Sequence, residues 1–428
     1  MSIRILVTSI PAWSDSTGAN TYSAILSGIH GIEVANLYTR ADFPDSKICS
    51  KYFQILEQNV IKSIFNYKIK TGKEFDLNNI DYVGGDKVLK EEKKRYAYFT
   101  KYRFTPFLLG RELLWKIGKW KSKELDDFLE EFKPDILLFS IESYIYFNRI
   151  NKYIIEKCKP SLVVGFLWDD NFTYKQSKSL GYIINRYFTR KSVFDLVKKC
   201  DKVLAISPKM KKECDAIFGI DSIIITKPIR GNKTQDYKLN YSRPIRLIYT
   251  GSLVIGRDKT LLHIVKAIKK INTDHQYFFL DIYTTTPLSK KMYASLNVNG
   301  CSCIRGGIPQ SQVFMEQENS DILVFIESFE NRTARLSFST KITDYLSSNR
   351  CILAIGPKDI SSIEYFIQQD SALVCTTPLE VETILNKLKD CPELIEQYAK
   401  KGYNCGIKNH SVEIIRSKMK NILEIENI

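Results

Sequence analysis

The sequence predicts an α/β protein made of two Rossmann-like, doubly wound domains, each with a parallel sheet. Its 428 residues are enough for two domains that each bury a core. A strand, a loop and a helix open the chain at Ile3, and the same pattern starts again at Ile245. After residue 245, short apolar strands alternate with helical stretches, which is typical of a parallel sheet. We expect one domain over residues 1–228, a second over 229–408 and a terminal helix over 409–428.

The composition is that of an ordinary globular protein, with 44% hydrophobic and 26% charged residues. No run of eighteen apolar residues occurs and the first residues form a strand pattern, so we expect neither a membrane span nor a secretory signal. The ten cysteines include no C-x-x-C pair, which argues against a zinc framework or a thioredoxin-type site and fits a reducing cytosol. The net charge of +15 requires an anionic partner: nucleic acid, an anionic membrane surface or a phosphorylated substrate.

The first domain begins with a predicted strand at residues 3–8, a polar loop at 11–20 and a helix at 21–29. Ligands of doubly wound domains bind at the carboxyl ends of the strands, so this loop, which contains Gly18, should face a crevice. The loop has no G-x-G-x-x-G pattern, and no dinucleotide fingerprint is predicted.

Residues 42–123 are rich in basic and aromatic side chains. Within them, apolar residues recur at helical spacing among lysines, namely Phe107, Leu108, Leu113, Leu114, Ile117 and Trp120. A basic amphipathic stretch of this kind suits an anionic membrane surface. An apolar stripe on a helix also commonly faces a core while its lysines remain in solvent, and both interpretations stay open.

Two later strands of the first domain are predicted at residues 135–139 and 162–167. The second of these strands ends just before Asp169 and Asp170. Polar residues at the carboxyl end of a strand are well placed to line a crevice, although Asp is also a common turn former.

The second domain follows a polar segment at residues 226–244 that is predicted to link the domains. Gly251, after the strand at 245–249, would let the backbone approach a ligand, and Arg257 and Lys259 could neutralise phosphate charge. The alternative is a solvated basic helix start, although cations are disfavoured at a helix N-terminus unless an anion binds there. Further strands are predicted at residues 278–283, 302–305, 321–326, 351–355 and 372–375.

The segment FSTKITDYLSSNRCILAIG, residues 338–356, predicts a helix that begins at about Ser339 and leads into a buried strand. The free N–H groups of this helix, the hydroxyls of Ser339 and Thr340 and the ammonium of Lys341 form a candidate site for a diphosphate. Asp344 is spaced to accept hydrogen bonds from a vicinal diol such as a ribose. An ordinary capped helix with a salt bridge is the alternative.

The run from Ser339 onward, S-T-K-I-x-D-Y-L-x-x-x-[RK]-x-I-L-A, resembles the sugar-nucleotide segment of GT-B-fold glycosyltransferases, in particular the large retaining family 4 (group 1). The resemblance implies two domains that face a cleft, with the terminal helix crossing back to the first, acceptor-side domain. It also implies that Ser339, Thr340 and Lys341 approach the nucleotide diphosphate and that Asp344 binds the ribose.

The same resemblance implies roles for residues outside this run. Gly18 would lie over the acceptor and the donor phosphates, and Asp169 or Asp170 would touch the transferred sugar. The turn that contains Gly306 and Gly307 would hold the nucleobase through main-chain groups.

The sequence departs from the family pattern at two places. Ser252 stands where an Arg is usual, so Arg257 or Lys259 would take over that role, and we favour Arg257. Leu336 stands where retaining members carry a first glutamate. Glu327 and Glu330 are the nearest carboxylates and are our candidates to reach the sugar, unless they are solvated loop acids.

With these features, the resemblance implies a glycosyltransferase that moves a sugar from a nucleotide-diphosphate-sugar donor to a hydroxyl acceptor. By the resemblance, the acceptor would be lipid-linked or a growing bacterial surface polysaccharide (capsule, O-antigen or exopolysaccharide), and the reaction would retain the anomeric configuration. We expect no metal and no other cofactor, no nucleic-acid partner, and a peripheral position on the inner, cytoplasmic face of the cytoplasmic membrane. The alternative is a noncatalytic nucleotide-binding or nucleic-acid-binding protein of the same fold.

Overall fold

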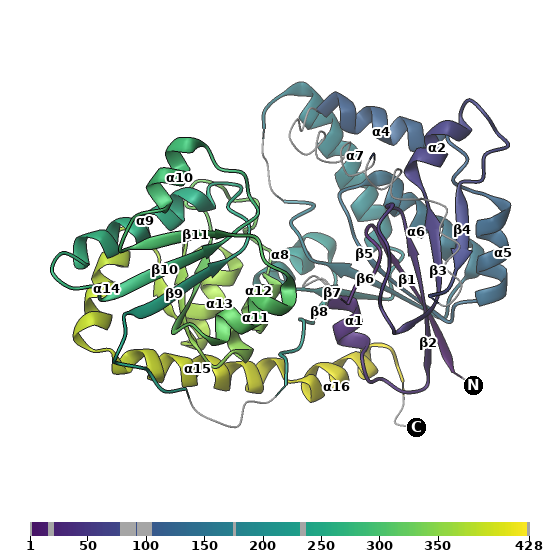
Figure 1. The fold of residues 1–428 in the computed structure, drawn as a ribbon. Coiled ribbons are helices and arrows are strands. Elements are labelled where there is room, and N and C mark those ends of the chain that lie inside the picture. The colour runs from purple at the N-terminus through teal and green to yellow at the C-terminus, as the bar shows by residue number, and fades with distance from the viewer. Residues whose placement is uncertain are drawn as a thin grey trace. The chain divides into compact units, whose positions relative to one another are not determined.

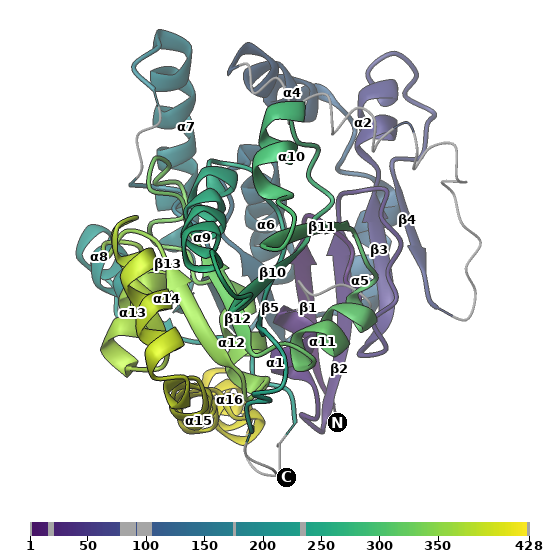
Figure 2. The same cartoon turned by 60° about the vertical axis from the view of Figure 1, so that its left-hand side comes forward.

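The computed structural model describes residues 2–15, 21–77, 91, 105–173, 177–231 and 237–425, so Gly18 lies outside the described residues. The chain divides into two compact units: unit 1 is Met1–Ile225 with Arg416–Ile428, and unit 2 is Thr226–Ile415. Each unit has a largely parallel sheet with helices packed on it (Figures 1 and 2). The predicted α/β class with two Rossmann-like domains is therefore confirmed.

Within the described residues, the sheet of unit 1 has eight strands in the order β4-β3-β2-β1-β5-β6-β7-β8. Its strands are β1 (Ile3–Ser9), β2 (Ile32–Tyr38), β3 (Cys49–Ile55), β4 (Gly72–Phe75), β5 (Ile136–Ser140), β6 (Leu162–Leu167), β7 (Lys202–Ala205) and β8 (Ile223–Ile224). The pairing is parallel except between β3 and β4. Because β1 pairs with β2 on one side and with β5 on the other, the strand order reverses between β1 and β5. The carboxyl ends of β1 and β5 therefore flank a position where ligands of such folds bind.

The helices of unit 1 are α1 (Thr21–Leu26), α2 (Glu57–Ser63), α4 (Thr105–Ile117), α5 (Lys123–Phe132), α6 (Ile145–Cys158), α7 (Leu180–Val197) and α8 (Pro208–Phe218). Local sequence signals explain their ends. The Ser122 side chain caps α5 by accepting a hydrogen bond from Leu125 N (3.2 Å). The helix α1 ends earlier than predicted, because the backbone of Gly28 is left-handed (φ 72°) and stops the helix there.

The basic aromatic stretch forms α4 and the turn after it. Its helix faces the core in part, and the membrane interpretation stays a prediction. Trp115 and Trp120 are buried against unit 1, whereas Leu113 and Ile117 are 56% and 60% exposed. The side chain of Phe107 is outside the described part of the structure. Among the helices that the structure describes, none combines the length and apolarity needed to cross a bilayer.

The sheet of unit 2 has six parallel strands in the order β11-β10-β9-β12-β13-β14. Its strands are β9 (Ile245–Thr250), β10 (Phe278–Tyr283), β11 (Ser302–Gly306), β12 (Ile322–Ile326), β13 (Cys351–Ile355) and β14 (Leu373–Cys375). All lie where the sequence predicts a strand, to within one residue at either end. The strand order reverses between β9 and β12, so the carboxyl ends of these two strands flank the second candidate ligand position.

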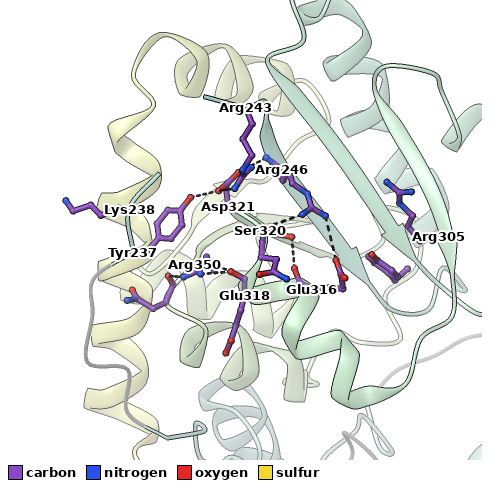
Figure 3. A pocket seen from close by; sticks show the side chains of 13 residues that line it. Tyr237, Lys238, Arg243, Arg246, Arg305, Glu316, Glu318, Ser320, Asp321 and Arg350 are labelled. Carbon is purple, nitrogen blue, oxygen red and sulfur yellow. Dashed lines mark hydrogen bonds and ion pairs between the residues drawn. The ribbon is translucent and has the colours of Figure 1, made fainter. Parts of the chain in front are cut away.

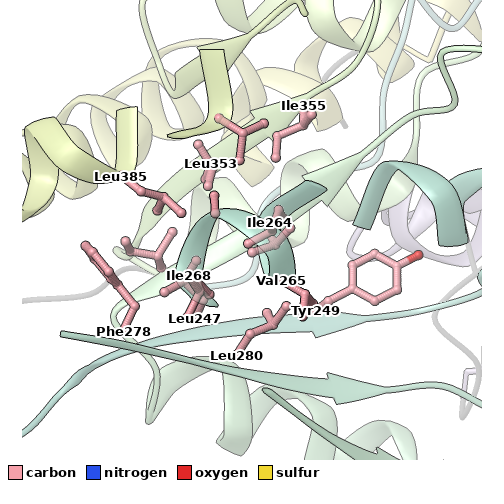
Figure 4. Packing of buried hydrophobic residues seen from close by; sticks show 14 of the residues in the cluster. Leu247, Tyr249, Ile264, Val265, Ile268, Phe278, Leu280, Leu353, Ile355 and Leu385 are labelled. Carbon is pink, nitrogen blue, oxygen red and sulfur yellow. The ribbon is translucent and has the colours of Figure 1, made fainter. Parts of the chain in front are cut away.

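A continuous apolar core lies between the sheet of unit 2 and the helices on one face of it (Figure 4). Leu247 and Leu280 of the sheet meet Ile264 and Ile268 of α9, and all four side chains are fully buried. The helices of unit 2 are α9 (Arg257–Ile271), α10 (Lys290–Leu296), α11 (Gln310–Glu318), α12 (Thr340–Ser347), α13 (Ser361–Gln369), α14 (Glu380–Asp390) and α15 (Glu393–His410). This core fixes the strand ends and the start of α9, which carry the candidate site.

The segment at 226–244, predicted to be a polar linker, is buried in unit 2 at its start. Lys227 is 5% exposed, and Ile229 N donates a hydrogen bond to His410 O (2.8 Å). The Thr226 hydroxyl lies 2.7 Å from Nδ1 of the same buried histidine, at the end of α15. The first residues of this segment are thus part of the unit 2 packing.

The last described helix is α16 (Val412–Ile422), and from Arg416 onward the chain belongs to unit 1. Lys202 Nζ donates hydrogen bonds to Ile422 O (2.8 Å) and to the Glu424 carboxylate (2.6 Å). These bonds attach the end of the described chain to the start of β7.

Candidate functional site

The predicted donor-binding residues of unit 2 meet at the carboxyl ends of β9 and β12, where the strand order reverses. A small cavity of about 40 Å³ lies there, lined by Tyr249, Arg257, Glu327, Ser339, Lys341 and the last residues of β12. These side chains come from four separate segments of the chain. The sequence singled out four of them, and the structure brings those four together.

The helix α12 begins at Thr340, as its capping residue predicts. Ser339 has an extended backbone (φ −64°, ψ 132°), and its hydroxyl accepts a hydrogen bond from Lys341 N (3.4 Å). The free N–H groups of the first turn give this end of the helix a partial positive charge. Since Ser339 and Lys341 line the cavity, the positive end of α12 lies next to it.

Lys341 is held in a close contact with the turn after β9. Its Nζ donates a hydrogen bond to Thr250 O (2.7 Å) and lies 5.3 Å from the centre of the Tyr249 ring. A side chain at Gly251 would place its Cβ 1.9 Å from this ammonium, so the lysine can hold this position only beside a glycine. Burial in the first place and the charge of Arg257 in the second lower the pKa of Lys341 to about 8.

Arg257 stands at the first position of α9 and pairs with a buried carboxylate. One of its terminal nitrogens donates to Glu327 Oε2 (2.9 Å), and the Glu327 side chain is 3% exposed. Burial raises the pKa of Glu327, while the charge of Arg257 acts against that shift. The Arg257 Nε is buried and has no hydrogen-bond partner within the described residues. A buried N–H of this kind costs free energy unless an acceptor binds it, and therefore indicates a position for a ligand oxygen.

Glu330 and Lys259, the other two predicted residues of this region, form an exposed ion pair (2.7 Å). Their side chains are 61% and 57% exposed, respectively. A pair this exposed contributes little to stability. Neither residue lines the small cavity.

Asp344 has partners that the sequence did not indicate. Its Oδ1 accepts a hydrogen bond from Lys227 Nζ (3.0 Å), and Arg230 Nε lies 3.5 Å from the same oxygen. The Asp344 and Lys227 side chains are 9% and 5% exposed. Asp344, on α12, therefore forms an ion pair with Lys227. Its role in binding a ribose stays a prediction.

The predicted glycine turn after β11 is present. Gly306 has a left-handed backbone (φ 81°), and its carbonyl accepts a hydrogen bond from Thr284 N (2.9 Å). A Cβ on Gly307 would lie 2.4 Å from the Thr285 side chain, so the two loops approach closely. Ser252, in the turn after β9, is exposed, and its carbonyl accepts the Tyr249 hydroxyl (2.7 Å).

In unit 1, Asp170 caps the turn that follows β6. Its Oδ1 accepts a hydrogen bond from Thr173 N (2.7 Å). This is the turn-forming role expected as the alternative for an Asp at this position. Asp169 is exposed beside it.

Sequence reasoning missed Glu142, which follows the carboxyl end of β5 in unit 1. Burial raises the pKa of Glu142 to about 7; a hydrogen bond from Ser140 lowers it, and the charge of Asp169 raises it. The side chain of Asn148 holds the backbone of Glu142, because its Nδ2 donates a hydrogen bond to Glu142 O (2.8 Å). The signal was available, because Glu142 is a polar residue just after a predicted strand, as Asp169 is. A carboxyl group with such a pKa at a strand end is a candidate proton acceptor.

A larger groove of about 970 Å³ lies along unit 2 (Figure 3). It extends from the amino ends of β9, β12 and β13 to Tyr283 and Arg305, near the carboxyl ends of β10 and β11. Its arginines are bound within the protein. Arg243 makes a bidentate pair with the buried Asp321 (2.6 and 2.9 Å), and Arg246 and Arg305 bind the buried Asp281 (2.9 and 2.7 Å). The groove shares no lining residue with the small cavity, and the charges of these arginines are paired within unit 2.

No family model matches this sequence, and no curated protein does. Solved structures match it over nearly its whole length. Sucrose-phosphate synthase from Thermosynechococcus elongatus aligns with a TM-score of 0.62 at 11% identity, covering 99% of this chain and 98% of that one. Anabaena HepE in complex with UDP and glucose aligns with a TM-score of 0.61 at 9% identity, covering 99% of both chains. The calicheamicin glycosyltransferase CalG4 aligns with a TM-score of 0.50 at 8% identity over all of both chains. The chain therefore has the GT-B fold that the resemblance implied.

Proposed function

We propose that this protein is a glycosyltransferase that binds a nucleotide-diphosphate sugar in unit 2 and transfers the sugar to a hydroxyl acceptor. Anabaena HepE, which has the same fold, was solved with UDP, with UDP and glucose, and with UDP-glucose, and this supports a uridine nucleotide as the first donor to test. The proposal on this chain is carried by the buried, unpartnered Nε of Arg257, a residue that lines the cavity together with Lys341 and the start of α12.

The donor diphosphate would bind where these positive groups converge. Its oxygens would accept hydrogen bonds from Arg257 Nε, from Lys341 and from the first N–H groups of α12. The same groups stabilise the charge that develops on the leaving diphosphate, so that they act in the transition state as well as in binding. Glu327 acts through Arg257, because its carboxylate fixes the guanidinium that faces the phosphate.

The other predicted residues receive roles around this centre. Asp344 would bind the ribose through the carboxylate oxygen that does not bind Lys227, and Gly306 and Gly307 would contact the base. Glu330, which is exposed, remains the candidate carboxylate for the transferred sugar. On the acceptor side we propose Glu142 and Asp169, with Glu142 taking the proton of the acceptor hydroxyl.

The resemblance to the retaining family 4 is the basis for further parts of the proposal. We propose retention of the anomeric configuration and a lipid-linked or growing bacterial surface polysaccharide as the acceptor. The protein would work as a peripheral protein on the cytoplasmic face of the membrane. We expect no metal requirement, because Arg257, Lys341 and the helix end can stabilise the diphosphate.

The test combines turnover and binding. Release of free nucleotide diphosphate from a panel of nucleotide sugars, beginning with UDP-glucose, is expected for at least one donor. Arg257→Ala and Lys341→Ala should each weaken UDP binding in calorimetry by roughly 1.5–3 kcal/mol, the value of a charged hydrogen bond. Lys270→Ala is the matched control, since Lys270 lies at the other end of α9 and pairs with Glu382 on the surface.

The outcomes separate the two functional classes. Unchanged UDP affinity in both site variants would refute the phosphate site. Tight nucleotide binding without turnover of any donor would favour the noncatalytic alternative, which the buried Leu336 at the usual glutamate position supports.

A further inference from the structure

The helix α7 has two halves with different surroundings. In its second half, Val193, Leu196 and Val197 are buried in unit 1. In its first half, the large apolar side chains are exposed to solvent, namely Leu180 (73%), Ile183 (52%), Ile184 (40%), Tyr187 (63%) and Phe188 (48%). A soluble surface rarely exposes such a cluster unless it binds something.

Two neighbouring elements extend this apolar surface. The helix α4 contacts both α7 and α2, and all three lie at the same end of unit 1 in both views (Figures 1 and 2). On α4, Leu113 and Ile117 are more than half exposed. After α2, Phe65 and Tyr67 are 87% and 73% exposed. We call these exposed residues of α7, α4 and the turn after α2 the apolar end of unit 1.

The charge around the apolar end is positive. The sequence has no Asp or Glu between Asp170 and Asp195, whereas Lys178, Arg186, Arg190 and Lys191 lie in this interval. Arg186 and Arg190 donate hydrogen bonds to the carbonyls of residues 172 and 173, and Lys178 and Lys191 are exposed.

The acidic residues of α2 and α4 are used inside the unit. They are Glu57, which accepts hydrogen bonds from Arg111 (2.6 Å) and Trp115 (2.7 Å), and Glu112, which accepts one from Ile145 N (3.0 Å). Lys116, next to the exposed Ile117, is itself exposed. Apolar and aromatic side chains among lysines and arginines, with the acids turned inward, match the interface of an anionic bilayer.

We infer that the apolar end of unit 1, centred on the first half of α7, docks on an anionic lipid bilayer. The apolar side chains insert at the level of the headgroups, and the basic side chains bind the lipid phosphates. This inference deepens the proposed function by giving it a membrane partner surface, and it moves the centre of that surface from α4 to α7. It requires no donor and no acceptor, so it can fail independently of the proposed activity.

The experiment is co-sedimentation of the full chain with vesicles of phosphatidylcholine alone or with 30% phosphatidylglycerol. We expect binding that requires phosphatidylglycerol and weakens as salt rises from about 0.1 M to about 1 M, because the Debye length falls from about 10 Å to about 3 Å. Ile183→Gln with Tyr187→Gln should reduce the partition coefficient by roughly tenfold or more. Lys191→Glu should reduce it by roughly fivefold or more.

Matched controls lie on unit 2. Leu379→Gln alters an apolar side chain that is 86% exposed, and Lys408→Glu reverses an exposed charge on α15; both should bind vesicles like the wild type. Unchanged binding of the α7 variants, or equal binding to both lipid mixtures, overturns the inference. A wild-type dimer in light scattering that becomes a monomer in the α7 variants also overturns the inference, because the surface then binds a second copy of the chain. Calorimetry with UDP on the α7 variants should give wild-type affinity, which keeps the result separate from the donor site.

Discussion

Replacing Lys341 by Met should make the protein more stable without nucleotide and at the same time abolish tight nucleotide binding. Lys341 is a buried ammonium whose hydrogen-bond partner, Thr250 O, is a neutral carbonyl. Methionine has a similar length and fills the same space without a charge. The opposite signs of the two effects distinguish a residue that serves ligand binding from one that serves folding.

The expected increase in the free energy of unfolding follows from the pKa of Lys341, which is about 8 in the folded protein against an ordinary value of 10.5. Between these two values the unfolded chain binds more protons than the folded protein, so stability rises with pH in that window. Below pH 8 the folded protein carries the whole cost of the buried charge, about 3 kcal/mol for a shift of this size. Losing the bond to Thr250 O costs about 1 kcal/mol, which leaves a net gain of about 2 kcal/mol at pH 7.

The assay is thermal unfolding at pH 7 with and without UDP, together with calorimetry between pH 7 and 9. The variant should melt roughly 4–8 °C higher than the wild type without nucleotide, if unit 2 melts as one unit. UDP should stabilise the wild type and leave the variant unchanged. Because the diphosphate favours the ammonium form, wild-type affinity should fall by up to about tenfold per pH unit above pH 8. A variant that is less stable than the wild type, or that binds UDP equally well, would refute this reasoning.

Three other substitutions test separate parts of the site. Asp344→Asn should weaken UDP binding but not pyrophosphate binding in calorimetry, since pyrophosphate has no diol; equal losses would mean that Asp344 acts through Lys227 or the helix. Gly251→Ala should displace the Lys341 ammonium and reduce UDP affinity by about tenfold with the fold intact, judged by circular dichroism; wild-type affinity would contradict the close contact. Activity that requires ionised Glu142 should rise with pH through about 7 and become both lower and flatter in Glu142→Gln; an unchanged pH profile would remove Glu142 from the acceptor side.

The fold could be predicted from the sequence to the extent that its signals are local. The strand Cys351–Ile355 was predicted with the bounds that the structure has, because an apolar run before a Gly-Pro turn has few alternatives. The start of α12 could be predicted from Ser339, because a serine before an apolar helical pattern is a common capping residue. The strands β3 and β4 were not predicted, because their mixed sequences become strands only through pairing with β2 and with each other.

The candidate site was predictable in its location but not in its contacts. Strand ends and helix starts indicated the region of Arg257, Lys341 and Glu327, since the carboxyl ends of parallel strands meet at one edge. The pair between Lys227 and Asp344 joins positions 117 residues apart and arises from packing of the supposed linker, for which the sequence offers no local signal. Glu142 was missed for a different reason: its residue type was visible, but its shifted pKa depends on burial that follows from the assembled sheet.

The distribution of partners within the site explains why an anion should bind at Lys341 and Arg257 rather than at Lys227. The Lys227 ammonium is buried against the full negative charge of Asp344, so a phosphate there would compete with a carboxylate that is already desolvated. Lys341 contacts a neutral carbonyl, and Arg257 shares one carboxylate while its Nε is unpartnered. Two positive charges and one negative charge thus face the cavity, and the positive end of α12 adds to them. A diphosphate gains most where positive charge is buried without full compensation, which is at the end of β9 and β12, next to the turn of Gly251.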